Sequence, residues 1–228
     1  MRTKTLLIAA AALAVGIGSS MAQTYSANIV GYTTTKLISG LNLVCPTVQV
    51  TSSNNAEQVF PCLTSGDQLY LWKTNGSGFV IYYFNGPNDW FDAISGNPIP
   101  APLLPLGAAL YYQNLSGSPE TNTFAGTVVL GNTNSLISGL NLVGSTAPVG
   151  AGLESTNYTL PLVQGDQIYI WKTDGSGFLI DYYNGPNDWF DAISGNPIAQ
   201  PNLTVGAGFY YQNLSGSTEV WKQNVVVP

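Results

Sequence analysis

The sequence predicts an all-β protein built from two tandem homologous domains, each a small β-sandwich or β-barrel. First, a block of 34 residues, Gly66–Ile99, returns 99 positions later as Gly165–Ile198, with 28 identities and no gap. Second, Tyr, Thr, Val and Gly are abundant, whereas only 8% of the residues are charged. Third, long helical periodicity is absent from the repeated part. We therefore expect a duplicated β unit, with domains at 23–124 and 125–228.

The N-terminal segment has the pattern of a secretory signal peptide. A basic start is followed by an apolar, alanine-rich stretch from Leu6 to Ile17, and Ser20-Met21-Ala22 has the form of a cleavage site. We expect residues 1–22 to be removed and the mature chain to be secreted to the periplasm, the cell surface or the medium. No later segment reaches the length of a membrane span, so membrane insertion is not expected.

The charge balance limits the classes of partner. Beyond the N-terminal segment, four lysines face twelve acidic residues, which gives a net charge of −8. Such a surface repels phosphate backbones and anionic lipids, so nucleic acid is not an expected partner. Other copies of the chain or other surface proteins are the expected partners, with glycans as the alternative.

Within each unit the pattern predicts strands joined by tight turns. Gln68–Trp72 alternates in polarity and Phe79–Phe84 is β-branched and aromatic, while Asn75-Gly76 between them supplies the positive φ of a hairpin turn. Gly107–Gln113 is a further expected strand. Asn88–Ala93 follows Gly-Pro, and one of its first two residues can cap a short helical turn there.

The two copies also predict which strand face is buried. Phe79, Ile81 and Tyr83 are unchanged in the second copy, whereas the residues between them vary. Because side chains alternate between the faces of a strand, the unchanged face is predicted to be the core, and Tyr82 to be partly exposed. The same rule predicts an exposed aromatic stripe on the preceding strand, made of Tyr70 and Trp72.

Three candidate β-segments resemble one another, although there are only two repeats. Tyr25–Gly31 is similar to Thr123–Gly131, and Asn224–Val227 ends the chain in the same way. A surplus β-segment can pair with a sheet edge of another molecule. We therefore predict that the N-terminal one completes a neighbouring sheet by strand addition.

Both cysteines lie in the first copy. The second copy has Gly144 and Pro161 where the first has Cys45 and Cys62, so the pair is present or absent together. In an exported protein this favours a disulfide that closes a short loop, worth about 3 kcal/mol, over two free thiols. A zinc site is not expected, because the chain has no histidine and two cysteines do not complete a tetrahedral shell.

No catalytic constellation is expected. Without histidine, Ser-His-Asp and Cys-His arrangements are impossible. A glycosidase could use a carboxylate pair, but turn formation and helix capping explain the shared acids more simply. The acids present in both copies are Asp67/Asp166, Asp89/Asp188, Asp92/Asp191 and Glu120/Glu219.

Two weaker site hypotheses remain. Hard oxygen ligands follow Gly-Pro in each copy and could bind calcium; otherwise no cofactor is expected. The calcium candidates are Asn88, Asp89, Asp92, Asn187, Asp188 and Asp191. Exposed aromatic rings could stack on sugars, and the candidates for glycan binding are Tyr82, Trp90 and Trp189. The alternative for the tryptophans is a place in the core.

The motifs GYxxxxLxxGxNLV, GDQIYxWKTxGSGF and GxGFYYQN resemble those of uncharacterised secreted tandem β-repeat proteins of verrucomicrobial and planctomycete-type bacteria. The likeness includes Gly31-Tyr32 and covers most of the mature chain. It implies a β scaffold and export, and it carries no activity with it. We therefore expect a non-enzymatic exported structural protein of a matrix, surface layer or filament. The alternative is a carbohydrate-binding or adhesin module.

Overall fold

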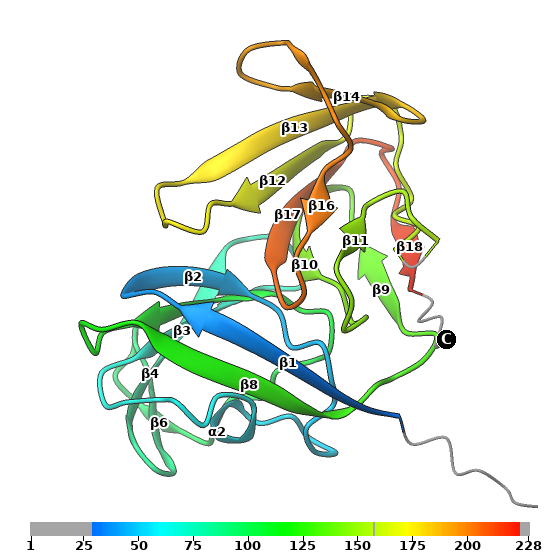
Figure 1. Ribbon diagram of the computed structural model, residues 1–228. Helices are drawn as coiled ribbons and strands as arrows, with labels where there is room; N and C mark the ends of the chain where they lie inside the picture. Colours follow the sequence, from blue (N-terminus) through cyan, green and yellow to red (C-terminus); the bar gives the residue numbers. More distant parts are fainter. Residues whose placement is uncertain (1–28, 157, 224–228) are drawn as a thin grey trace, which may run out of the picture.

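The computed structural model describes residues 29–156 and 158–223 (Figure 1). Nearly all regular structure within these ranges is β-strand, which confirms the predicted fold class. The predicted signal peptide, residues 1–22, lies outside the described residues. No helix in the described ranges is long and apolar enough to cross a membrane.

The main strands follow one another in the same order in both repeats, whereas α2 occurs only in the first and β11 and β16 only in the second. The first repeat contains β1 (Val30–Leu37), β2 (Gly40–Val44), α2 (Ala56–Val59), β3 (Gln68–Trp72), β4 (Phe79–Gly86), β5 (Asp89–Asp92), β6 (Pro98–Ile99), β7 (Leu110–Asn114) and β8 (Glu120–Thr127). The second contains β9 (Thr133–Leu136), β10 (Gly139–Gly144), β11 (Ala151–Gly152), β12 (Gln167–Trp171), β13 (Phe178–Gly185), β14 (Asp188–Asp191), β15 (Pro197–Ile198), β16 (Asn202–Leu203), β17 (Gly208–Asn213) and β18 (Glu219–Lys222).

Each repeat is built on a six-stranded antiparallel sheet. The strand order is β2-β7-β3-β4-β5-β6 in the first repeat and β10-β17-β12-β13-β14-β15 in the second. Two-stranded ribbons, β1–β8 and β9–β18, complete the repeats. Strand β8 ends at Thr127 and β9 begins at Thr133, so the chain crosses from the first repeat to the second between these residues.

One face of each sheet packs against its own ribbon and loops to form the core of that repeat. In the first repeat Leu69 and Tyr112 from the sheet meet Phe124 from β8 and Phe60 after α2. The ring of Phe60 lies 5.2 Å from that of Tyr112 and 5.5 Å from that of Phe124. Aromatic burial of this kind dominates the stability of small β-domains.

The predicted helical turn at Asn88–Ala93 is wrong. Asn88 has φ of +58° and closes the β4–β5 hairpin, after which Asp89–Asp92 forms strand β5. The left-handed turn conformation that Asn tolerates redirects the chain before a helix can start. The helix α2 instead forms in the loop that differs between the copies, where the side chain of Asn55 accepts from the Gln58 amide at 3.0 Å.

The opposite faces of the two sheets pack against each other and form a third core between the repeats (Figure 1). Its buried and half-buried residues include Tyr70, Trp72, Phe79 and Tyr111 and their counterparts Tyr169, Trp171, Phe178 and Tyr210. The predicted exposed stripe of Tyr70 and Trp72 is therefore covered. The face carrying Phe79 was predicted to be the core of a single domain, but it forms the contact between the repeats. Tyr82 is half-buried and packs towards the core of the first repeat.

The contact between the repeats follows an approximate two-fold axis. The Cys45 amide donates to the Gly206 carbonyl at 2.8 Å, and the equivalent Gly144 amide donates to the Gly107 carbonyl at 3.0 Å. Trp72 meets Tyr210 edge-on at 5.7 Å between ring centroids, and their equivalents meet at 5.6 Å. Each contact occurs twice with the roles exchanged, as in a symmetric dimer whose subunits are fused.

At the axis, equivalent residues face each other. A Cβ atom added to Gly144 would lie 2.3 Å from the Cβ of Cys45, and one added to Gly208 would lie 2.6 Å from the Cβ of Ala109. These distances are too short for non-bonded carbon atoms, so each pair accommodates one larger residue and one glycine. The copies differ at these positions because they cannot both carry the larger side chain.

The predicted disulfide is wrong, because both cysteines are free. Cys45 lies between the repeats, whereas Cys62 packs on the other side of the first sheet, where its Sγ donates to the Asn122 side chain at 3.5 Å. Burial raises the pKa of Cys45 to about 12 and that of Cys62 to about 11, so both remain protonated at neutral pH.

The N-terminal strand is already paired within the first repeat. Val30–Tyr32 pairs with the end of β8, in register with Thr127 to Ala125. This part of the predicted strand-addition segment is therefore engaged inside the molecule. Residues 23–28 and Asn224–Val227 lie outside the described residues.

Candidate functional site

The residues proposed for glycan binding do not present a surface to a sugar. Trp90 and Trp189 are each only 1% exposed. The Nε1 atom of Trp90 donates to Glu57 at 2.8 Å, and that of Trp189 donates to Glu154 at 2.8 Å. The two indole rings are therefore buried and offer no open face to a sugar, whereas Tyr82 is half-buried and packs against the core of the first repeat.

The two glutamates have the same structural role, although they are not at equivalent positions of the two copies. Glu57 lies in α2 and Glu154 follows β11, and they do not correspond in the alignment of the copies. Each also accepts the backbone amide of a turn residue, Asn88 at 2.8 Å and Asn187 at 3.1 Å. A carboxylate from a divergent loop therefore ties down the same hairpin in both repeats.

The predicted calcium ligands do not converge. Asp89 and Asp92 stand at the two ends of β5, about 10 Å apart along the strand and on opposite faces. Asp89 accepts from Asn85 at 2.6 Å, and Asp92 accepts the amides of Ile94 at 3.0 Å and Ser95 at 2.7 Å.

The second copy separates its candidates in the same way. Asp188 accepts from the Asn184 side chain, and Asp191 accepts turn amides at the far end of β14. The Asn187 amide is held by Glu154. Across the described part of the chain, no three Cys, Asp or Glu side chains are grouped so that they could hold a metal ion.

The fully buried acids serve the scaffold. Asp67 is 0% exposed and accepts from the Tyr112 hydroxyl at 2.6 Å, the Leu115 amide at 2.8 Å and the Thr64 amide at 2.8 Å. Burial and this hydrogen bond raise the pKa of Tyr112. Asp166 makes the equivalent bonds to Tyr211, Leu214 and Val163. These carboxylates have donors on both oxygens, as buried charges require.

One acidic pair exists only in the second repeat. Asp181 replaces Tyr82, is 6% exposed, and lies directly opposite Asp191 in the β13–β14 register. Burial, and then the charge of Asp191, raise the pKa of Asp181 to about 6. The amide of Ser194 and its hydroxyl lower the pKa of Asp191. Asp181 is paired with the buried Ile168 on the core-facing side of its strand, so it lies away from the solvent side of the sheet.

A conspicuous exposed feature is the turn between the last two strands of each sheet. We name Ala93–Pro98 and Ala192–Pro197 the apolar tips; every residue in them is exposed. Ile94 is 76% exposed and Ile193 is 78% exposed. The Asp92 carboxylate and Gly96, with φ of +70°, set the shape of the first turn, so the scaffold itself does not require the isoleucine.

The apolar tips belong to the least variable part of the repeat. The 15 residues Asn85–Ile99 are all identical in the second copy, and the six differences within the 34-residue block precede them. Four of those six differences fall on positions that are buried or half-buried in both copies. Buried strands have therefore changed while an exposed loop has not, the reverse of the usual pattern for a scaffold.

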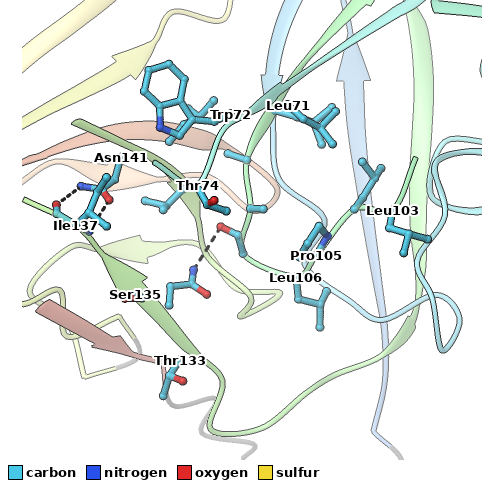
Figure 2. A pocket seen from close by; sticks show the side chains of 18 residues that line it. Leu71, Trp72, Thr74, Leu103, Pro105, Leu106, Thr133, Ser135, Ile137 and Asn141 are labelled. Carbon is cyan, nitrogen blue, oxygen red and sulfur yellow. Dashed lines mark hydrogen bonds between the residues drawn. The ribbon is translucent and has the colours of Figure 1, made fainter. Parts of the chain in front are cut away.

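A second feature is a cavity of about 680 Å³ at the junction of the repeats (Figure 2). The first repeat lines it with the end of β3 and the segment from Leu103 to Leu110, and the second with β9 and the start of β10. No charged side chain is among its lining residues. The Asn134 amide group donates to the Gly107 carbonyl at 3.3 Å and joins the two sides.

The cavity belongs to one side of the approximate two-fold axis. Leu103 and Leu106 line it, and the equivalent positions of the second repeat are Asn202 and Val205. Ser135 at its margin corresponds to Lys36. The buried Nε1 of Trp72 has no hydrogen-bond partner, but that of Trp171 has none either, so this feature belongs to the contact between repeats rather than to the cavity.

Comparisons with protein-family models, with curated proteins and with solved structures found no match. The apolar tips and the cavity were not predicted from the sequence. The identity of Asn85–Ile99 between the copies was the available sequence signal for the tips. The cavity had no sequence signal, because its lining comes from both repeats.

Proposed function

We propose that the protein is a non-enzymatic exported structural protein, a subunit of a matrix, surface layer or filament, which contacts its partners through the two apolar tips. The observation that carries this proposal is the unchanged exposed isoleucine of each tip, Ile94 and Ile193. The export part of the proposal rests on the N-terminal pattern and on the resemblance to secreted tandem β-repeat proteins.

An exposed isoleucine gains free energy only when another surface covers it. Burying such a side chain is worth about 1.5–3 kcal/mol, whereas the turn is already shaped by Asp92 and Gly96. An apolar residue that is held outward on a rigid turn in both copies is therefore best explained as a contact residue.

The position of the tips favours linkage between molecules. In Figure 1 the labels β6 and β14, next to the two tips, lie at opposite ends of the molecule. One chain therefore offers two equivalent contact points that face away from each other. A bivalent subunit of this kind can join two neighbours, which a matrix, layer or filament requires.

The shared acids support a non-catalytic role. Asp67 and Asp166 are saturated by internal donors, and Asp92 and Asp191 hold the turns of the apolar tips. A general acid or base needs a titratable group that reaches a substrate. These acids are instead occupied by the fold.

The proposal is tested by the assembly state of the exported chain. We expect the wild-type protein to form concentration-dependent assemblies in analytical ultracentrifugation and extended particles in electron microscopy. The double variant Ile94→Ser, Ile193→Ser is expected to remain monomeric. Leu130→Ser is the matched control, because Leu130 is 50% exposed but has no leucine counterpart in the other copy. A wild-type protein that stays monomeric, or a double variant that assembles normally, would overturn the proposal.

A further inference from the structure

We propose that the cavity at the junction of the repeats receives the apolar tip of a second copy of this chain. The inference rests on the proposed function, because it names the partner of the same tips. It joins two features of the described residues that the fold alone leaves unexplained, a convex apolar turn and a concave apolar cavity.

The two surfaces match in character. The cavity of about 680 Å³ falls within the range of protein binding pockets and is lined largely by Leu, Ala, Pro and Val. The rim residue Leu103 is 60% exposed, so part of the apolar surface is uncovered. A tip that placed Ile94 or Ile193 in the cavity would cover Leu103 as well as its own isoleucine.

Charge selects these surfaces from the rest of the molecule. The described residues include four lysines and twelve acids, so two copies carry the same negative net charge and repel each other. Neither the cavity lining nor residues 93–98 and 192–197 include a charged side chain. Contact between cavity and tip therefore brings together uncharged regions of two negatively charged molecules.

The cavity lies on one side of the two-fold axis, whereas the tips occur on both. Its equivalent in the other half would replace Leu103 by Asn202 and Ser135 by Lys36. Each molecule thus has two donors and one acceptor of this type. Repetition of a contact between two different surfaces produces an open chain, unless the rotation between neighbours closes it into a ring.

Either tip should serve this acceptor, because the tips are identical in sequence. Ile94→Ser alone and Ile193→Ser alone are therefore expected to assemble, and only the double variant is expected to fail. This separates the inference from a symmetric tip-to-tip contact, in which the loss of one tip would limit assembly to pairs.

The acceptor is tested with Leu103→Asp, which places a charge at the rim on an exposed residue. We expect self-association to weaken by at least about ten-fold. Asn202→Asp is the matched control, because it adds the same charge at the equivalent position of the other repeat and is expected to assemble normally. Ser135→Trp, at another exposed margin residue, would block the cavity without adding charge and should have the same effect as Leu103→Asp.

Mixing the variants gives the decisive result. Leu103→Asp retains two tips but no acceptor, and the double tip variant retains the acceptor but no tips. Neither assembles alone, but their mixture should form small complexes of one Leu103→Asp chain with one or two double-variant chains. If Leu103→Asp and Ser135→Trp both assemble like wild type while the double tip variant stays monomeric, the acceptor is wrong and the proposed function survives. If the double tip variant also assembles, both are wrong.

Discussion

The two repeats adopt one strand order but secure it with residues that do not correspond in sequence. In the first repeat Glu57 accepts a hydrogen bond from the indole N–H of Trp90. In the second, Glu154 accepts one from the indole N–H of Trp189. The loops that supply these glutamates have diverged, and only the first contains a helix. Both copies place a carboxylate next to the buried indole N–H, and different loops provide it.

The repeats also differ where they touch each other. Cys45 faces Gly144 and Ala109 faces Gly208, so the larger member of each pair lies in the first copy. Away from the axis the aromatic contacts are matched almost residue for residue. Within this contact, the aromatic residues are therefore the same in both copies, and the copies differ at the axis, where one space cannot hold two equal side chains.

The largest expected effect tests whether the two indole sites are equivalent. Trp90→Ala and Trp189→Ala should each lower the free energy of unfolding by about 3–5 kcal/mol, because each empties a buried site and removes one of the donors to a glutamate carboxylate. Urea denaturation of the two variants measures this. A much smaller loss in one of them would show that its loop has an alternative way to hold the hairpin.

An intermediate effect on stability is expected at Asp181, which replaces Tyr82 of the first repeat. The folded-state pKa of Asp181, about 6, is above its ordinary value of 3.8, so the folded state binds the proton more tightly. Stability is therefore expected to fall as the pH rises from about 4 to about 6, and the penalty persists above that range. Asp181→Asn should be more stable than wild type by roughly 2–3 kcal/mol at about pH 7.5, with little difference near pH 4.

Denaturation curves at several pH values measure this difference. Asp174→Asn is the control, because hydrogen bonds from Ser176 lower the pKa of Asp174 and its removal should give no gain at neutral pH. A stability difference between wild type and Asp181→Asn that does not change with pH would contradict the prediction.

The smallest expected effect concerns the two-fold axis. Gly144→Ala places a Cβ atom 2.3 Å from that of Cys45 and should cost about 1–3 kcal/mol through overpacking. The exchange Cys45→Gly, Gly144→Cys moves the larger side chain to the other copy and should recover most of that loss. An exchange variant as unstable as Gly144→Ala would mean that the axis is less symmetric than its hydrogen bonds indicate. Thermal unfolding followed by circular dichroism measures both variants.

Patterns local to the chain predicted the local structure well. The strands around Asn75-Gly76 form the expected hairpin, because alternation and turn chemistry act between neighbouring residues. Patterns that depend on distant residues failed. Trp90 was a sugar-binding candidate by composition, but its burial depends on Glu57, and the face of Phe79 was assigned to a domain core although the other repeat covers it.

Duplication, fold class and strand positions are thus encoded in short-range features of the sequence: the 99-residue period, the alternation of side chains and the turn residues. Tertiary packing alone decided the pairing of the two repeats, the free state of Cys45 and Cys62, and the exposure of Ile94 beside a buried Trp90. The physical reason is that burial is a property of the space between elements. That space is created only when both sheets have formed and packed, and no single segment contains the information about it.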